Sequence, residues 1–295
     1  MPDRAAIASI VRIDGDRARV DQDLVAVEAP LAIEWHAPAT GVVRSLGVFM
    51  RTPGDDEDLV RGMLYAEGVI RRREDLISVS LGPATDDAGA LIARVELASH
   101  IDAGALQTDR ASPGTSACGL CGRLVIDGLD HLSQHALPAS SALLPLAVVA
   151  PLPDRLRASQ TIFAETGGLH AAGLFDLTGT LLLTREDVGR HNALDKLVGA
   201  ALASGDLPAR DRIIVVSGRV AFEIVQKTVM AGVPILVAVG APSSLAVEAA
   251  RRARLTLAGF VRGSRFNIYT GHERFENSRE SHETATRHQE PRALD

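Results

Sequence analysis

The only two cysteines of this 295-residue chain form a C-x-x-C pair, Cys118 and Cys121, in the segment ACGLCGR. Four chemistries use this spacing: a redox dithiol, a structural zinc site, a zinc deaminase and a sulfur carrier. In a sulfur carrier, one thiolate accepts a terminal sulfur as a persulfide and then passes it on. The type of site therefore depends on what surrounds the pair.

The surroundings favour the sulfur carrier. A thioredoxin-like dithiol requires a strand before the pair, and the sequence shows no strand pattern there. A structural zinc site requires four ligands, and no nearby histidine completes the set. A zinc deaminase needs an upstream H-x-E motif, whose glutamate is the acid/base residue. The upstream histidines, His36 and His100, begin the tripeptides HAP and HID, so this glutamate is missing. Neighbouring glycines, with Arg110 and Arg123, favour an accessible thiolate. Two buried thiols that lie close by chance are the alternative.

A second group of polar residues lies in REDVGRHNALDKLVG, residues 185–199. We expect Asp187 to cap a helix, with Arg190, His191 and Lys196 in its first turns. Asp187, His191 and Asp195 then share one face, where carboxylates could fix the imidazole tautomer for proton transfer or for binding a polar ligand. A solvated amphipathic helix with ordinary ion pairs explains the spacing equally well.

Two small-residue turns and an arginine pair could bind an anion. Residues 217–219, which end in Arg219, and residues 240–244 each follow an aliphatic strand and precede a helix, whose N-terminus offers free N–H groups. In FVRGSRF, Arg262 and Arg265 flank a Gly-Ser turn, and arginine binds phosphate bidentately. An ordinary hairpin with exposed arginines is the alternative. The lone His170 in TGGLHAAG is more often structural than catalytic.

The first part of the chain predicts an α+β region. Residues 1–24 have a weak pattern, which indicates an arm or an edge strand. Strand-like segments and one helix follow, and they give way to a poorly patterned stretch, residues 100–122, that predicts a mobile loop carrying the cysteines. The predicted strands are residues 25–28, 31–35, 42–50, 77–81 and 91–97, and the predicted helix is residues 56–68.

The last part predicts an α/β region, because continuous aliphatic strands alternate with helices as in a parallel sheet. We therefore expect an arm (1–24), an α+β region that ends in the C-x-x-C loop (25–142), an α/β region (154–270) and a polar tail (271–295). The predicted helices are residues 154–166, 187–203, 221–231 and 243–257, and the predicted strands are residues 174–176, 180–184, 213–216, 235–239 and 260–270.

Net charge and hydrophobicity argue against some classes of function. The net charge is −6, so a role centred on duplex nucleic acid is not expected. No apolar run approaches the roughly 20 residues of a membrane helix, and the first twenty residues contain no signal-peptide core. We expect a soluble cytoplasmic protein. Lysine is rare: only Lys196 and Lys227 occur, against many arginines.

The chain resembles the formate dehydrogenase accessory sulfurtransferases of the FdhD type. The resemblance runs in matching order over most of residues 28–270. It is carried by EAPLAI, YAEGVI, CGLCG, TGGLHAA, EDVGRHNALDKLVG, SGRVAFEIVQKTVMAGVPIL, SSLAVEAA and LTLAGFVRGSRFNIYT. Gly168 stands where some members have a further cysteine, so no third thiol is expected.

The resemblance implies a fold and a function. The fold is similar to that of cytidine deaminases, with a mixed sheet between helical layers, and members form homodimers. The family carries sulfur from a cysteine desulfurase to the molybdenum or tungsten bis-guanine-dinucleotide cofactor of formate dehydrogenase, which is bound as substrate; no permanent metal is expected. Cys118 matches the persulfide carrier.

The site residues that we expect to hold phosphates and guanine come partly from the resemblance and partly from the residues themselves. The family's cofactor segment matches Phe260, Val261, Arg262, Gly263, Ser264 and Arg265. Arg190, His191, Lys196 and Arg219 are added, and Cys121 is expected to assist Cys118. Two alternative functions remain: a cofactor-binding chaperone that carries no sulfur, and a zinc-dependent deaminase of similar fold.

Overall fold

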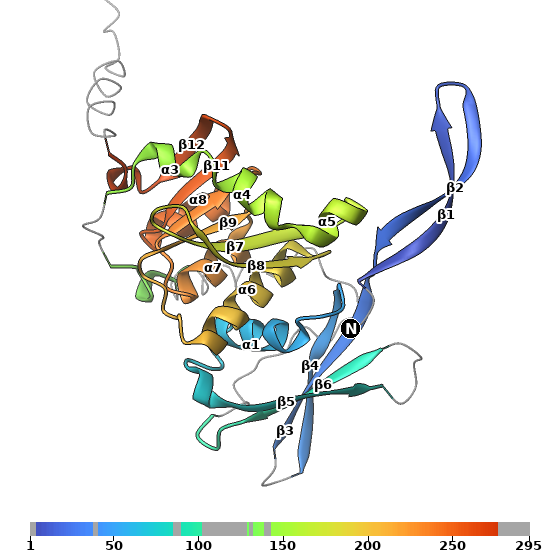
Figure 1. Ribbon diagram of the computed structural model, residues 1–295. Coiled ribbons are helices and arrows are strands. Elements are labelled where there is room, and N and C mark those ends of the chain that lie inside the picture. The colour runs from blue at the N-terminus through green and yellow to red at the C-terminus, as the bar shows by residue number, and fades with distance from the viewer. Residues whose placement is uncertain are drawn as a thin grey trace, which may run out of the picture.

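The computed structural model describes residues 4–37, 41–84, 90–101, 129, 132–138 and 143–276. In these residues the strands form three sheets, which Figure 1 shows as a projecting ribbon, a small sheet and a larger helix-covered sheet. Within the described ranges, no helix is both long and apolar enough to span a membrane.

The projecting ribbon is an antiparallel pair, β1 (Ala5–Asp14) and β2 (Arg17–Ala26), joined by a tight turn. It extends away from the rest of the molecule (Figure 1). The sequence predicted an arm or an edge strand here. The regular pairing of the two strands went unpredicted.

The second sheet has four strands in the order β4-β3-β6-β5. Its strands are β3 (Ala29–Ala37), β4 (Val42–Arg51), β5 (Leu76–Pro83) and β6 (Leu91–Leu97), and a 3-10 turn, η1 (Arg73–Asp75), precedes β5. Helix α1 (Asp56–Ala66) covers one face, where alternate residues such as Leu31, Ile33 and Val95 are fully buried. These elements confirm the α+β region predicted from the sequence.

The third sheet has six strands in the order β12-β11-β10-β9-β7-β8, with β9, β10 and β11 parallel and the other pairs antiparallel. The mixed sheet with helices on its faces was predicted and is confirmed. Its strands are β7 (His170–Asp176), β8 (Leu181–Asp187), β9 (Arg212–Val216), β10 (Ile235–Ala238), β11 (Thr256–Arg262) and β12 (Arg265–Thr270).

Both faces of this sheet are buried, because alternate strand residues enter two different cores. Ile214 and Val216 pack with α6 (Arg190–Ser204), α7 (Phe222–Met230) and α8 (Ser244–Arg252). Ile213 and Val215 pack instead with α3 (Leu146–Val149), α4 (Leu152–Ser159) and Phe275, which follows η3 (His272–Arg274). The continuous aliphatic strands of the sequence reflect this double burial.

Three predicted helix boundaries were wrong. Residues 154–166 form two helices, α4 and α5 (Thr161–Thr166), because Gln160 between them has a non-helical backbone (φ −81°, ψ 84°). The helix predicted over 243–257 ends at Arg252, since Arg254 has a positive φ of 57°. Helix α6 begins at Arg190 and not at 187, because Asp187 is the last residue of β8.

Helices α1 and α6 join the small sheet to the large one. They cross so closely that a Cβ at Gly62 would overlap the carbonyl oxygen of Asp195, and one at Gly199 would overlap that of Asp58. The hydrophobic core is continuous across this crossing, from Leu59 on α1 to Leu197 on α6. The crossing fixes the loop before α1 against the start of α6, next to the candidate site.

Candidate functional site

The carboxyl ends of β9 and β10 form two turns that lie against each other. The N–H of Gly240 donates to the carbonyl oxygen of Gly218 (3.2 Å), and the N–H of Phe260 donates to that of Gly240 (3.2 Å). A Cβ at Gly240 would lie 2.6 Å from the Gly218 oxygen, so a larger residue would separate the turns. The small residues seen in the sequence are therefore required by this close approach.

The predicted arginine turn stands beside them, at the end of β11. Arg262 and Arg265 are register partners across β11 and β12, and both are exposed. Gly263 between them has a φ of +53°, which glycine adopts without strain. Two like charges placed opposite each other are mutually unfavourable. No described residue forms an ion pair with either one, so a bound anion would relieve their repulsion.

A cavity of about 580 Å³ opens at this edge of the sheet. Arg262 and Gly263 contribute to one wall, and His170 and Ser217 contribute to another. The remaining walls come mainly from α4 and α5, and the lining includes Pro153, Asp154, Leu156, Arg157, Gln160, Phe163, Gly167, Gly168, Leu169, Val239 and Val261. The cavity thus lies beyond the carboxyl ends of the parallel strands, where α/β sheets bind their ligands.

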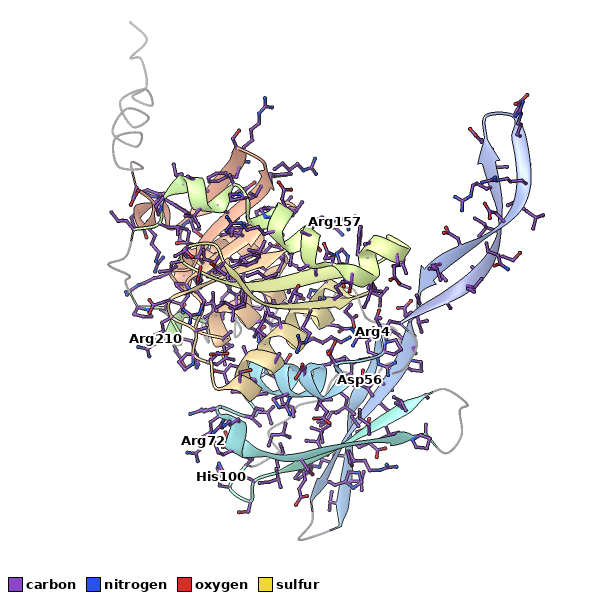
Figure 2. The ribbon with its side chains drawn as sticks, viewed as in Figure 1. Arg4, Asp56, Arg72, His100, Arg157 and Arg210 are labelled. Carbon is purple, nitrogen blue, oxygen red and sulfur yellow. The ribbon has the colours of Figure 1, made fainter. Side chains whose placement is uncertain are left out.

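Two of these wall residues were not singled out from the sequence. Arg157, labelled in Figure 2, lies on α4 with its guanidinium carbon 3.6 Å from the centre of the Phe163 ring, a cation–π contact that holds the side chain in place. Gln160 is 4% exposed, and its Nε2 has no hydrogen-bond partner among the described residues. Neither residue lies in a recognisable motif.

His170 also belongs to this wall, although the sequence suggested a structural role for it. Burial lowers its pKa below the ordinary value, the positive charge of Arg190 lowers it further, and Asp187 opposes both. Its Nδ1 would lie 3.3 Å from a Cβ at Gly218, so the ring packs against the first turn. Near neutral pH the imidazole is therefore uncharged and can accept or donate one hydrogen bond.

Arg190 and His191 begin α6 beside the same turn. A Cβ added at Gly218 would lie 3.6 Å from the Cβ of Arg190. The Nε of Arg190 is buried without a hydrogen-bond partner in the described part of the chain. His191 Nε2 lies 4.0 Å from a Glu223 carboxylate oxygen. Arg219 is exposed on the turn itself. The structure thus brings Arg190 and His170 together at the first turn, but of these residues only His170 lines the cavity; Arg190, His191 and Arg219 do not.

The predicted face of Asp187, His191 and Asp195 is not formed. Asp187 lies on β8, where its carboxylate accepts hydrogen bonds from the Gly189 N–H (2.8 Å) and the Asn192 amide (3.1 Å). Asp195 pairs with Lys227 at 2.6 Å. The prediction that all three residues share one helix face was therefore wrong for Asp187, whereas His191 and Asp195 both lie on α6, four residues apart.

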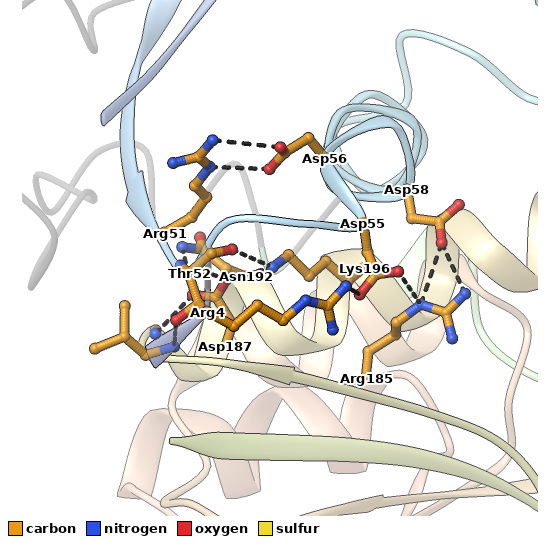
Figure 3. A network of polar contacts seen from close by, with 12 residues as sticks. Arg4, Arg51, Thr52, Asp55, Asp56, Asp58, Arg185, Asp187, Asn192 and Lys196 are labelled. Atoms are coloured by element: carbon orange, nitrogen blue, oxygen red, sulfur yellow. Dashed lines mark hydrogen bonds and ion pairs between the residues drawn. The ribbon is translucent and has the colours of Figure 1, made fainter. Parts of the chain in front are cut away.

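Lys196 is placed differently from the prediction that it contacts phosphates. It is 1% exposed, and its Nζ lies 2.7 Å from Asp187 Oδ2 and 2.8 Å from the carbonyl oxygen of Thr52 (Figure 3). Thr52 completes the contact, since its N–H donates to Asp187 Oδ2 (3.1 Å) and its hydroxyl accepts from the Val188 N–H (3.1 Å). Lys196 therefore positions the start of α6 and does not face the cavity.

Further ion pairs extend this buried network around α1 (Figure 3). Arg51 pairs with Asp56 at 2.9 Å, and Arg185 pairs with Asp58 at 2.8 Å. The network links the small sheet to β8 and α6, and so holds the Arg190 end of α6 in place. Cys118 and Cys121 lie outside the described residues, as do Arg110 and Arg123.

The family model that matches this chain and the known proteins that resemble it indicate the same family. The FdhD/NarQ family model matches residues 26–276. The sulfur carrier protein FdhD of Nocardia farcinica is 47% identical over 256 residues, which cover 86% of this chain and 88% of that protein. The sulfur carrier protein FdhD of Mycobacterium tuberculosis is 40% identical over 269 residues, with coverages of 89% and 95%.

A solved structure shares the fold. The crystal structure of a formate dehydrogenase accessory protein from Desulfotalea psychrophila superimposes with a TM-score of 0.69 at 24% identity. The match covers 93% of this chain and all of that one. The arrangement of sheets and helices is therefore common to both proteins.

Proposed function

Because this chain belongs to the FdhD/NarQ family, we propose that it is a sulfur carrier that serves a formate dehydrogenase. The sulfur acceptor is Cys118, and the donor is the persulfide of a cysteine desulfurase. The destination is a molybdenum or tungsten bis-guanine-dinucleotide cofactor, which the protein binds as substrate. The relatives' names support the carrier role, and the cysteine pair supplies the necessary thiol.

The loading step is a thiol–persulfide exchange. The Cys118 thiolate attacks the terminal sulfur of the donor persulfide, a new S–S bond forms on Cys118, and the donor cysteine leaves as a thiolate. For unloading, the Cys121 thiolate attacks Cys118 Sγ, a Cys118–Cys121 disulfide forms, and sulfide leaves. This step supplies the two electrons that reduce the sulfane sulfur, and an external thiol reductant then restores the pair.

The observation that carries the cofactor part of the proposal is the arginine turn at the cavity. Arg262 and Arg265 are adjacent, exposed and without an ionic partner among the described residues. Guanidinium groups bind phosphates bidentately, and the small-residue turns allow a large ligand to approach the backbone. His170 lines the same cavity as Arg262, and Arg190 lies beside the Gly218 turn at the start of α6. Lys196 contributes by holding α6 in place.

The experiment that tests the proposal is intact-mass analysis after incubation with a desulfurase and cysteine. The wild-type chain is expected to gain one sulfur mass, which a reducing agent removes. Cys118→Ala is expected to gain none, and Cys121→Ala serves as the matched control that still loads. Loading of the Cys118→Ala variant to the wild-type extent would exclude Cys118 as the carrier.

A further inference from the structure

The cavity at the carboxyl ends of the parallel strands has two chemically different walls. Arg262 and Gly263 belong to one wall, where the positive charge suits phosphate groups. A second wall, called the helix wall below, is built by α4 and α5 and includes Asp154, Arg157 and Gln160. The volume of about 580 Å³ lies in the usual range for pockets that enclose a small molecule. The helix wall therefore contacts a part of the ligand other than its phosphates.

Gln160 gives the helix wall a buried amide that the folded chain leaves unpaired. The residue is 4% exposed, and its Nε2 has no hydrogen-bond partner among the described residues. Its backbone groups are both satisfied, because its N–H donates to the Arg157 carbonyl oxygen (3.2 Å) and its carbonyl oxygen accepts from the Ala164 N–H (3.1 Å). A buried donor without an acceptor costs free energy. An acceptor atom of a ligand in the cavity would supply the missing hydrogen bond.

Arg157 gives the same wall a fixed guanidinium plane. Its guanidinium carbon lies 3.6 Å from the centre of the Phe163 ring. Phe163 is itself held in place, since its N–H donates to a carboxylate oxygen of Glu186 (2.9 Å), a buried residue on β8. The Ile162 N–H donates to the other oxygen of the same carboxylate (3.1 Å). Planar bases stack on guanidinium planes, so the helix wall suits the ring of a nucleotide.

Asp154 gives the helix wall a carboxylate acceptor. It lies one helical turn before Arg157 on α4, and it is exposed. No described residue forms an ion pair or a hydrogen bond with this carboxylate. A carboxylate can accept two hydrogen bonds at once from neighbouring donors. Guanine offers such a pair, a ring N–H beside an amino group, whereas adenine presents a ring nitrogen lone pair at the corresponding position.

We propose that Asp154 and Gln160 are specificity-determining residues for the ring of the ligand. The Asp154 carboxylate accepts from the N–H and the amino group of a 2-amino-4-oxopyrimidine ring, and the Gln160 amide donates to an acceptor of the same ring system. The guanidinium of Arg157 stacks on the ring face. The inference rests on the proposed function, because the guanine and pterin rings of the bis-guanine-dinucleotide cofactor both contain this pyrimidine ring. It concerns residues outside the arginine turn.

The test is calorimetric titration of GDP, IDP and ADP into the full chain. IDP lacks the amino group of guanine, and ADP lacks both donors. The wild-type chain is expected to bind GDP at least about fivefold more tightly than IDP and at least about tenfold more tightly than ADP. Asp154→Asn is expected to lower the GDP-to-ADP preference at least about fivefold, because an amide offers one acceptor in place of two. The matched control is Asp211→Asn, an exposed carboxylate beside the amino end of β9, whose preference should not change.

Gln160→Met gives a readout that a purely structural role would not produce. Methionine keeps the length of the side chain and removes the unpaired donor. The melting temperature of the ligand-free chain is therefore expected to rise, while the Kd for GDP is expected to increase about fivefold or more. A lower melting temperature together with an unchanged Kd would show that the amide serves the fold, and would overturn the role given to Gln160.

Titrations of guanosine and neopterin, neither of which carries a phosphate, distinguish the two rings. Tighter binding of guanosine assigns the guanine ring to the helix wall, and tighter binding of neopterin assigns the pterin ring. Equal wild-type affinities for GDP, IDP and ADP would overturn the proposal, as would an unchanged GDP-to-ADP preference in Asp154→Asn. Sulfur loading of Cys118, measured by intact mass, is the independent check: loading that persists in a chain without ring selectivity overturns this inference and leaves the carrier role in place.

Discussion

The cations of this molecule occupy two contrasting regions. At the junction of α1 and α6, Lys196 is 1% exposed and is held by Asp187 and Thr52. At the end of β11, Arg262 and Arg265 are exposed and lie side by side without an ionic partner in the described ranges. The first region has a fixed carboxylate for each cation. The second has two cations and, within the described ranges, no carboxylate paired with them.

The difference separates positioning from binding. A buried ion pair costs desolvation when it forms, and removing one partner leaves an unpaired charge behind. Exposed arginines contribute little to stability and keep their hydrogen-bonding capacity for a ligand. Both lysines of the chain are used in the first way, because Lys227 is also buried against Asp195. We therefore expect opposite results when the two regions are mutated.

The largest expected effect is on stability at the buried junction. Lys196→Met keeps the length of the side chain but leaves the Asp187 carboxylate buried without its cation. We expect it to lower the free energy of unfolding by about 3–5 kcal/mol in urea denaturation. Arg262→Met is the matched control, because it removes an exposed charge, and its stability is expected to change by less than about 0.5 kcal/mol. Equal losses of unfolding free energy in the two variants would contradict the difference between the buried and the exposed cations.

The crossing of α1 and α6 provides the next effect. In an ordinary helix, replacing glycine with alanine is stabilising by roughly 0.5–1 kcal/mol. At Gly199 the new Cβ would overlap the Asp58 carbonyl oxygen, so Gly199→Ala is expected to be destabilising, by about 1–3 kcal/mol. Thermal or urea unfolding measures this sign reversal. A more stable variant would show that the helices can move apart at little cost.

The arginine turn is expected to affect binding and not stability. Arg265→Ala should weaken guanine-nucleotide binding by about tenfold or more, because each charge-assisted hydrogen bond contributes about 1.5–3 kcal/mol. The control is Arg210→Ala, an exposed arginine near the amino end of β9, at the opposite edge of the sheet from the turns (Figure 2). Calorimetry should show no change for this control. A Kd that is unchanged in Arg265→Ala would remove the turn from the site.

The smallest expected effect is a pH dependence at His170. Burial lowers its pKa in the folded chain, so the unfolded chain binds a proton more readily. The resulting stability is fully present above the ordinary histidine pKa of 6.5 and is lost as pH falls through the lower folded pKa. His170→Gln should therefore lose less stability than the wild-type chain between pH 7 and pH 5. Identical pH slopes would contradict this account of the ring.

Much of the fold followed from the sequence because strand burial leaves a clear pattern. Aliphatic runs such as residues 213–216 and 235–239 predicted buried parallel strands, and the small residues after them predicted the tight turns. At residues 1–24 the sequence predicted an arm or an edge strand but not the paired ribbon, because both strands are almost entirely solvent-exposed and buried residues do not mark their period. The break at Gln160 is a backbone conformation that no glycine or proline signals.

The site was predicted in part. The Arg262–Arg265 pair followed from residue type and spacing, which are local. Lys196 was misassigned because its partner Thr52 lies 144 residues away in the sequence. Arg157 and Gln160 were missed for the same reason, since only the packing of α4 and α5 on the sheet places them at the cavity. Contacts made by distant segments leave no local pattern.

The most direct test of the account is a calorimetric titration of GDP into the wild-type chain, Cys118→Ser and Arg262→Ala. We propose that affinity comes from the arginine turn and that Cys118 only carries sulfur. Cys118→Ser is therefore expected to bind GDP with a Kd close to that of the wild-type chain, and Arg262→Ala with a Kd at least about tenfold higher. If Cys118→Ser loses affinity as severely as Arg262→Ala does, the thiol segment forms part of the pocket and the separation of the two roles is wrong.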